Sequence, residues 1–233
     1  MFTYLSNTYK NKLASADWSQ YMAIWLGAAF LVSVPVFFQA PLVRQAPWIS
    51  LILTVGWLSL SRQWLEDESR HHWGSIMWGF SLTWFCGSIY WSWLRWEPLW
   101  HLPIEAIALP WAIWAIFKRQ NSYLVGAWFY LGSLVGTGIT DIYFYLTDVV
   151  PQWRELMQLE SNVEMVRPLL QSAIAQIQTP WGMIWMMLLA LWIMAIGIRA
   201  MASKQIHHWA FSGALLCTLV VDSLFGISAV LLN

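Results

Sequence analysis

The sequence predicts an all-α, polytopic membrane protein, a bundle of about seven transmembrane helices. Three observations predict this fold class. Hydrophobic residues make up 59% of the 233 positions, only 10% are charged, and the mean hydropathy is positive, which is unusual for a soluble domain of this length. The apolar residues gather in segments of near-membrane length. The basic residues fall alternately on the two sides that these segments define.

The predicted spans follow from the length that a bilayer requires. A helix rises about 1.5 Å per residue and the hydrocarbon core is about 30 Å thick, so a span needs roughly 20 mostly apolar residues. The candidate segments are 19–39, 46–61, 74–94, 103–117, 123–146, 180–202 and 208–232. The second and fourth are short and contain or adjoin prolines, so each is either a full span or a tilted, broken or re-entrant helix. Several of the 20 tryptophans stand at or near segment ends, where indole rings favour the headgroup region.

Charge placement predicts that all the segments cross and that the N-terminus is cytoplasmic. In this topology one side holds every lysine and most of the basic residues. They are Lys10, Lys12, Arg62, Arg70, Lys118, Arg119, Arg199 and Lys204, against Arg44, Arg95, Arg154 and Arg167 on the other side. By the positive-inside rule the lysine-rich side is the cytoplasm. Residues 1–233 then form a single integral membrane domain, with 147–178 as an extramembrane helical insertion on the outer side.

The insertion is predicted to contain an amphipathic helix at about 150–178. Its apolar residues repeat at alternating spacings of three and four, which places them on one helical face. Pro168 is expected to interrupt this helix or to start a second one after Arg167. Two interpretations remain open: the apolar stripe packs on the outer end of the bundle itself, or it docks a partner protein. The docking candidates are Leu156, Leu159, Val163, Val166 and Leu170.

Ionisable residues inside the predicted spans are the first candidates for a functional site, because a charge within a bilayer is costly. The topology places Glu105, Asp141 and Asp222 in the outer half of the membrane, so the three carboxyls are expected to share a cavity. Arg95 is a further candidate for its lining. A ligand or proton site is one role for these residues, and structural hydrogen bonding or an interfacial position is the other.

Asp141 also extends a stripe of small and polar residues along the fifth segment. The stripe consists of Gly132, Ser133, Gly136, Thr137 and Thr140. Gly132 and Gly136 form a GxxxG pair, which permits close approach of two helix backbones. This face is therefore expected to be turned toward other helices.

Two histidine pairs occur in matching contexts. His71 and His72 precede the third segment, and His207 and His208 precede the seventh, both at the predicted inner boundary. If the two helices are neighbours, four imidazoles can hold a metal, a haem or a chlorophyll magnesium. Adjacent residues on a helix point about 100° apart, so one pair alone chelates poorly, and an interfacial polar collar is the alternative.

Residues 34–58 (VPVFFQAPLVRQAPWISLILTVGWL) and 74–110 (GSIMWGFSLTWFCGSIYWSWLRWEPLWHLPIEAIALP) together resemble the first membrane helices of apolipoprotein N-acyltransferase. In that family a proline-containing turn joins two short helices, and a Gly/Phe-rich helix ends in a Tyr-Trp pair, matched here by Tyr90 and Trp91. The family's chemistry resides in an outer nitrilase-like domain that uses Glu, Lys and Cys. The predicted outer side of this chain has no lysine and no cysteine, so acyl transfer is not carried over.

The whole chain also resembles an uncharacterised family of cyanobacterial multipass membrane proteins. That resemblance implies a thylakoid or plasma membrane location and work near photosynthetic membrane complexes. The chain has no GxxxxGK[ST], HExxH or GxSxG motif and no large basic cluster, which argues against nucleotide, zinc-protease, serine-hydrolase and nucleic-acid functions. The sequence does not specify a cofactor.

Three functions from different classes remain. A noncatalytic accessory or assembly protein, binding membrane lipid and another membrane protein or complex, explains the features with the fewest assumptions. A transporter of small solutes or a lipid-handling protein is favoured by the outer carboxyls. A divergent enzyme acting on lipid acyl groups is supported by the partial resemblance alone.

Overall fold

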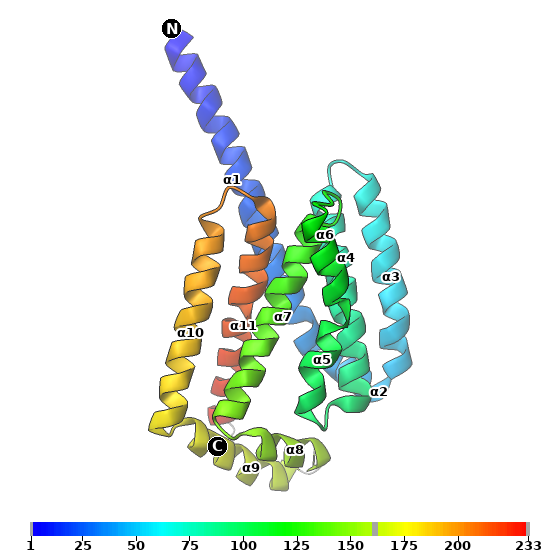
Figure 1. Cartoon of the computed structure of the whole chain (residues 1–233), viewed down its shortest axis with the longest axis vertical. Coiled ribbons are helices and arrows are strands. Elements are labelled where there is room, and N and C mark those ends of the chain that lie inside the picture. The colour runs from blue at the N-terminus through cyan, green and yellow to red at the C-terminus, as the bar shows by residue number, and fades with distance from the viewer. Residues whose placement is uncertain (1, 160–162, 232–233) are drawn as a thin grey trace.

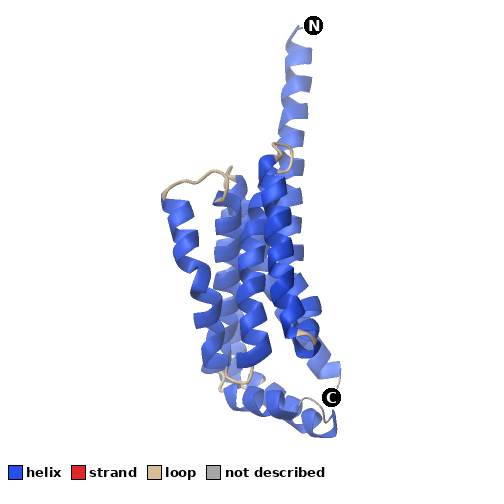
Figure 2. Ribbon diagram, turned by 90° about the vertical axis from the view of Figure 1, so that its right-hand side faces the viewer, coloured by secondary structure: helices blue, strands red, loops and turns tan. Residues whose placement is uncertain are grey.

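The computed structural model describes residues 2–159 and 163–231, with side chains for residues 18–159 and 165–228. Every described element is helical (Figure 1, Figure 2). In chain order they are α1 (Phe2–Val34), the π-helical turn η1 (Pro35–Gln39), α2 (Ala40–Gln45), α3 (Pro47–Glu66), α4 (His71–Ile89), the π-helical turn η2 (Tyr90–Leu94), the 3-10 turn η3 (Pro98–Trp100), α5 (His101–Glu105), the 3-10 turn η4 (Ala106–Ala108), α6 (Leu109–Phe117), α7 (Leu124–Leu146), α8 (Val150–Leu159), α9 (Val163–Ile177), α10 (Pro180–Met201) and α11 (Ile206–Leu231).

Within the described residues, four helical segments are long and apolar enough to cross a membrane. They are Trp18–Gln45, Pro98–Phe117, Pro180–Met201 and Ile206–Ser228. The predicted all-helical fold with membrane-spanning segments is therefore confirmed for these four segments, by their length and composition. The other long helices, α3, α4 and α7, contain many Gly, Ser and Thr residues, and α4 and α7 bury most of these small residues inside the bundle.

The helices pack in a simple order around α4 and α7. α4 lies between α3 and α7, α7 packs on α11, and α11 packs on both α1 and α10 (Figure 1). Phe80 and Trp84 of α4 and Phe129 of α7 are almost completely buried in one core cluster, in which Phe80 and Trp84 pack against Trp57 of α3. α10, by contrast, exposes most of its large apolar side chains, as expected for a helix at the edge of a membrane bundle.

Glycines allow α7 to approach its neighbours closely. A Cβ on Gly126 would lie 1.9 Å from the backbone oxygen of Ser75 on α4, and the Gly126 amide donates to the Ser75 hydroxyl at 2.9 Å. A Cβ on Gly132 would lie 2.4 Å from the backbone oxygen of Phe211 on α11. The prediction that the small face of α7 is turned toward other helices is thus confirmed.

The helices are irregular at one end of the bundle. α1 passes through the π turn η1 into α2, α4 ends in the π turn η2, and the segment Pro98–Phe117 is broken by 3-10 turns on both sides of α5. Proline stands at the start of η1 and η3 and near the start of α6, where its missing N–H is tolerated. The predicted segment 103–117 is therefore a broken helix, whereas the predicted segment 46–61 is a regular helix extended to Glu66.

α8 and α9 cross this same end of the bundle (Figure 1). α9 continues through Pro168, so the predicted break at that residue is wrong. Proline near the start of a helix removes a single backbone hydrogen bond, which the rest of α9 tolerates. The predicted docking residues Leu156, Leu159, Val166 and Leu170 are half-buried, and the side chain of Val163 lies outside the described residues.

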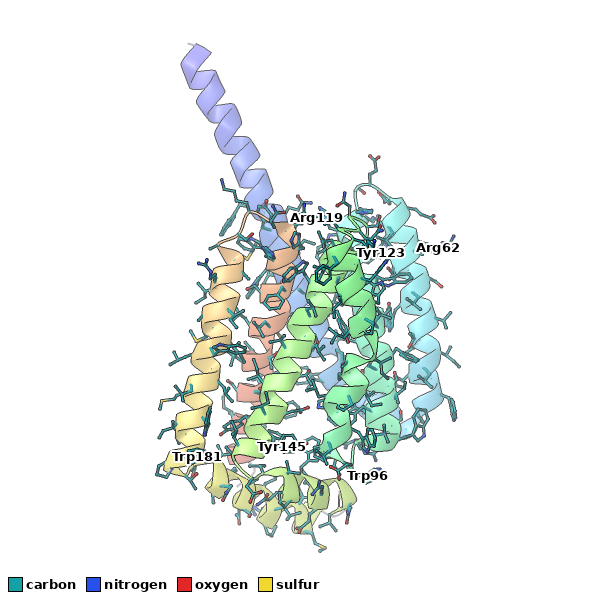
Figure 3. All side chains as sticks on the ribbon, viewed as in Figure 1. Arg62, Trp96, Arg119, Tyr123, Tyr145 and Trp181 are labelled. Atoms are coloured by element: carbon teal, nitrogen blue, oxygen red, sulfur yellow. The ribbon has the colours of Figure 1, made fainter. Side chains whose placement is uncertain are left out.

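The two ends of the bundle differ in their side chains. Arg62, Arg119 and Tyr123 mark the end that carries the α3–α4, α6–α7 and α10–α11 turns, and Trp96, Tyr145 and Trp181 mark the end covered by α8 and α9 (Figure 3). We call the second of these the α8–α9 end.

Candidate functional site

A buried histidine–aspartate pair lies near the α8–α9 end. His101, the first residue of α5, is hydrogen-bonded through Nδ1 to Oδ1 of Asp141 on α7 at 3.0 Å. The His101 side chain is 19% exposed and the Asp141 side chain 11% exposed, so water screens the pair weakly. With Asp141 ionised, the imidazole N–H is the donor.

Aromatic rings hold the imidazole in place. The Tyr90 ring, in the π turn η2, stacks on His101 with a centroid separation of 4.3 Å and an interplanar angle of 24°. Trp91 approaches the imidazole edge-on at 5.9 Å, and Trp153 of α8 approaches Trp91 at 6.0 Å. The Trp153 indole also donates to the backbone oxygen of Arg95 at 3.0 Å. α8 thereby packs against the aromatic residues around His101.

Asp141 has an unused hydrogen-bonding position. Its Oδ2 atom is buried and has no hydrogen-bond partner among the described residues. A buried polar atom left without a partner is unfavourable, and such atoms in native structures call for a water, an ion, a proton or a ligand. The free oxygen is therefore the strongest indication that Asp141 binds something.

Glu105 lies one helical turn after His101, which brings the two residues to the same side of α5. Glu105 is 9% exposed, and its backbone oxygen accepts a hydrogen bond from the buried Tyr130 hydroxyl of α7. Asp141 is within electrostatic range of Glu105. Glu105 therefore lies near the His101–Asp141 pair, and its sharing of a cavity with Asp141 stays a prediction.

Asp222 is placed differently. Its carboxylate accepts a hydrogen bond from the Thr140 hydroxyl at 2.8 Å, and the residue is exposed at the side of α11. Thr140 and Asp141 are neighbours in α7 but point toward different helices, α11 and α5 respectively. The three carboxyls therefore do not all face one another. Asp222 lies within electrostatic range of Asp141, but it is hydrogen-bonded to Thr140 and not to the His101–Asp141 pair.

Arg95 follows the π turn η2 and interacts with the end of that helix. Its Nη1 donates to the backbone oxygens of Trp91 at 3.1 Å and Ser92 at 3.4 Å. Nearby, Arg154 of α8 forms a two-pronged ion pair with Glu97 at 2.9 and 3.1 Å. The Arg154 guanidinium lowers the pKa of the Glu97 carboxyl. This pair links α8 to the residue before η3, close to His101.

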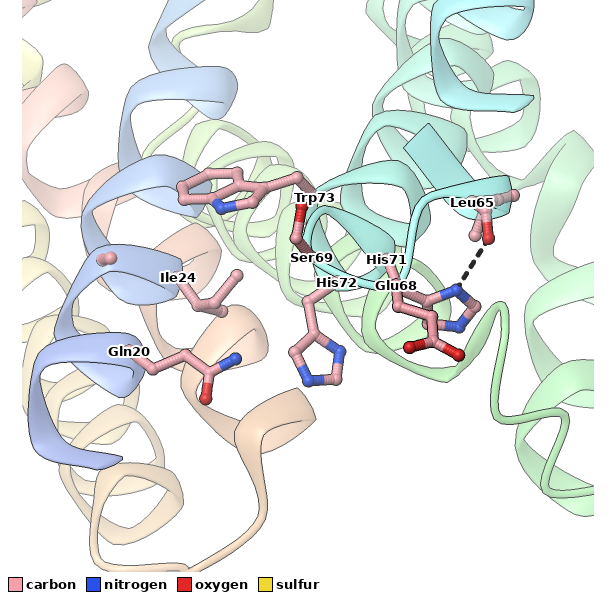
Figure 4. A pocket seen from close by; sticks show the side chains of 9 residues that line it. Gln20, Ile24, Leu65, Glu68, Ser69, His71, His72 and Trp73 are labelled. Carbon is pink, nitrogen blue, oxygen red and sulfur yellow. Dashed lines mark hydrogen bonds between the residues drawn. The ribbon is translucent and has the colours of Figure 1, made fainter. Parts of the chain in front are cut away.

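The two histidine pairs lie at the opposite end and apart from each other. His71 and His72 line a cavity beside α1 (Figure 4), whereas His207 and His208 pack on Trp128 of α7. Within the described residues, no group of three or more His, Cys, Asp or Glu could hold a metal ion. The four imidazoles therefore do not form one metal site.

Sequence reasoning missed two parts of the α8–α9 end. The first is His101, although a histidine four residues before Glu105 in an apolar segment is a detectable signal. The second is the fully buried Gln39, whose amide donates to the Trp84 oxygen at 2.6 Å and the Ser88 hydroxyl at 2.8 Å. These bonds fix the π turn of α1 against α4, and nothing in the local sequence marks them.

A family model described as "Protein of unknown function (DUF3120)" matches residues 28–230. The match runs from the last two turns of α1 to the last turn of α11, and so includes every residue of the histidine–aspartate site. No curated protein and no solved structure matches the chain.

Proposed function

We propose that this chain, which belongs to the family described as protein of unknown function (DUF3120), is a proton-coupled transporter of small solutes. The proposal rests on the site geometry, in which His101 and Asp141 form the proton site. The single observation that carries the proposal is the buried pair itself, in which Asp141 keeps one oxygen without a partner. Intramembrane carboxylates and imidazoles are costly, and proton relays are a common reason for them.

The proposal includes a topology. The segments α1, α3, α4, α5 with α6, α7, α10 and α11 each cross the bilayer, with the N-terminus in the cytoplasm, as the distribution of lysine and arginine favours. The α8–α9 end is then the outer side, and His101 and Asp141 lie in the outer half of the membrane. α8 and α9 form a cover over the site.

The broken helix gives protonation a mechanical consequence. A proton on Asp141 removes the negative charge that attracts His101, and so weakens the contact between α5 and α7. α5 is bounded by 3-10 turns, which offer hinges at both of its ends. Discontinuous membrane helices often form transporter binding sites, since they free backbone groups next to a cavity. Proton uptake is therefore coupled to movement of α5.

A pH-jump experiment on a solid-supported membrane tests this role. Proteoliposomes containing the wild-type protein should give a transient charge displacement when the outer pH is stepped, because a proton enters a buried site. Asp141→Asn and His101→Phe should each reduce the amplitude at least fivefold. A panel of small solutes added at constant pH then identifies the transported class.

The matched control is Asp148→Asn. Asp148 is exposed, follows the same helix, and has φ of 54°, a conformation that asparagine tolerates. This variant should keep the wild-type amplitude, and all variants should elute as folded protein on size exclusion. No transient above protein-free liposomes, or a full transient from Asp141→Asn, would overturn the proposal.

An accessory or assembly role is the second candidate, and α10 favours it. Its exposed face is rich in methionine and tryptophan, and methionine suits adaptable contacts between helices. The exposed residues are Trp181, Met183, Met186, Met187, Trp192 and Met194. The partner would be a larger membrane complex, for which a photosynthetic complex in a cyanobacterial thylakoid or plasma membrane is the first choice. A gentle-detergent pull-down from the native membrane should then recover its subunits, and a partner-free protein would contradict this role.

A further inference from the structure

A cavity of about 300 Å³ opens between α1 and the turn that joins α3 to α4 (Figure 4). It lies at the end of the bundle opposite α8 and α9, whereas His101 and Asp141 lie near the α8–α9 end. Gln20, Ile24, Glu68, His71, His72 and Trp73 are among the residues that line it. Its volume is at the lower end of the range of about 300–1,000 Å³ for ligand pockets, which suits a small group.

The cavity offers several hydrogen-bond acceptors beside the donors of Gln20, Ser69 and Trp73. Nδ1 of His71 contacts the backbone oxygen of Leu65 at 2.9 Å, and since a carbonyl only accepts, this nitrogen carries the hydrogen. In the neutral ring, Nε2 of His71 is then an acceptor. Nδ1 of His72 is buried and has no hydrogen-bond partner among the described residues. The Glu68 carboxylate adds two acceptor oxygens at the rim.

The formal charge in the cavity is negative. Glu68 is the one Asp, Glu, Lys or Arg among the described residues that line it. Arg70 lines an adjoining hollow instead, and its Nε lies 3.6 Å from the Asp67 carboxylate, which compensates it. A ligand that complements a carboxylate and free imidazole nitrogens is a cation with several N–H donors.

The apolar wall suits the same ligand. Ile24 and the indole of Trp73 form one side of the cavity, and the Trp73 ring covers Gly27 of α1. An indole face attracts a cation, with a larger gain when the cation loses water. Gln20 lies close to Trp18, where the apolar part of α1 begins, so the cavity is at the level of a membrane surface. Both a soluble amine and a lipid headgroup can reach it.

We propose that this cavity binds a primary ammonium group, supplied either by a small free amine or by an aminophospholipid headgroup. The ammonium donates to the Glu68 carboxylate and to the imidazole nitrogen of His72, while its carbon chain lies against Ile24 and Trp73. A quaternary ammonium lacks N–H donors and an alcohol lacks the charge, so both should bind more weakly. The site is independent of the proton site.

The test uses the full chain in phosphatidylcholine nanodiscs, with ethanolamine as the probe. Ethanolamine should raise the unfolding temperature of the wild-type protein in a concentration-dependent manner, and ethylene glycol and choline should not. Glu68→Gln should weaken the ethanolamine affinity about tenfold or more, since a charge-assisted hydrogen bond is lost. Glu66→Gln is the matched control, because Glu66 pairs with Arg62 at 3.4 Å outside the cavity.

A second arm separates the two sources of the ammonium group. Native mass spectrometry after exchange into nanodiscs of mixed phosphatidylethanolamine and phosphatidylcholine should show retained phosphatidylethanolamine if the natural ligand is a lipid. Loss of that retention in Glu68→Gln, but not in Glu66→Gln, assigns the lipid to this cavity. Ethanolamine binding without lipid retention assigns a free amine. Absence of both, equal binding of choline, or unchanged binding by Glu68→Gln would overturn the proposal.

Discussion

Replacing Asp141 with alanine should destabilise the bundle by leaving His101 without its partner. Nδ1 of His101 is bonded to Asp141 Oδ1 at 3.0 Å, and the stack on Tyr90 holds the ring where it is. The imidazole cannot swing into water without giving up that stack. The variant therefore leaves a polar nitrogen unsatisfied inside the bundle.

The size of the effect follows from the burial of the pair. An unsatisfied buried polar group costs about 1–3 kcal/mol. Hydrogen bonds between membrane helices average about 0.6 kcal/mol and reach about 1.7 kcal/mol. His101 and Asp141 form a buried bond that includes a carboxylate, so we expect Asp141→Ala to cost about 1.5 kcal/mol, near the upper value. This is roughly a tenfold change in the folding equilibrium.

A double variant distinguishes the lost bond from general damage. In His101→Phe with Asp141→Ala, the phenyl ring keeps the stack on Tyr90 and no polar group is orphaned. The double variant should therefore cost less than the sum of the two single variants, by about 1 kcal/mol. Reversible unfolding in mixed micelles, followed by tryptophan fluorescence, measures all three. A cost below about 0.5 kcal/mol for Asp141→Ala, or strict additivity, would refute the reasoning.

Two further predictions concern the packing and the cover of the site. Gly126→Ala should lower the free energy of unfolding by about 1–3 kcal/mol, because the new Cβ meets the rigid backbone oxygen of Ser75 at 1.9 Å. Gly56→Ala is the control: a Cβ there has nothing within 4 Å, so the variant should be neutral or slightly stabilising. The same unfolding assay compares the two. The Glu97–Arg154 pair should make stability depend on pH: since the pKa of Glu97 is lowered in the folded protein, its contribution is complete above the usual value of 4.5 and is lost as pH falls through the lower folded value. Between pH 6 and pH 3, the unfolding temperature of Glu97→Gln should therefore fall less than that of the wild type. An equal fall in both would exclude the Glu97–Arg154 pair as the cause of the pH dependence.

The sequence predicted the positions of the long helices well, because long apolar runs mark them in the sequence. The small face of α7 was also predictable, since glycine at a spacing of four has a direct packing meaning. Which part of the protein covers the apolar stripe on α8 and α9 was not predictable, because periodicity shows only that a helix has an apolar face.

His101 was missed for a traceable reason. The predicted fourth segment began at residue 103, which left this histidine outside the membrane, whereas the apolar helical segment begins at Pro98. The separation of Asp222 from Asp141 was equally hidden, since depth along a helix was predictable but rotation about its axis was not. Thr140 and Asp141 point to different helices although they are consecutive.

The central claim is that Asp141 takes up a proton inside the membrane, and pH-difference infrared spectroscopy of the protein in lipid films tests it most directly. On acidification, a protonated-carboxyl band should appear in the wild type and in Asp148→Asn and be missing from Asp141→Asn. An infrared difference spectrum that is the same for the wild type and Asp141→Asn would contradict the account.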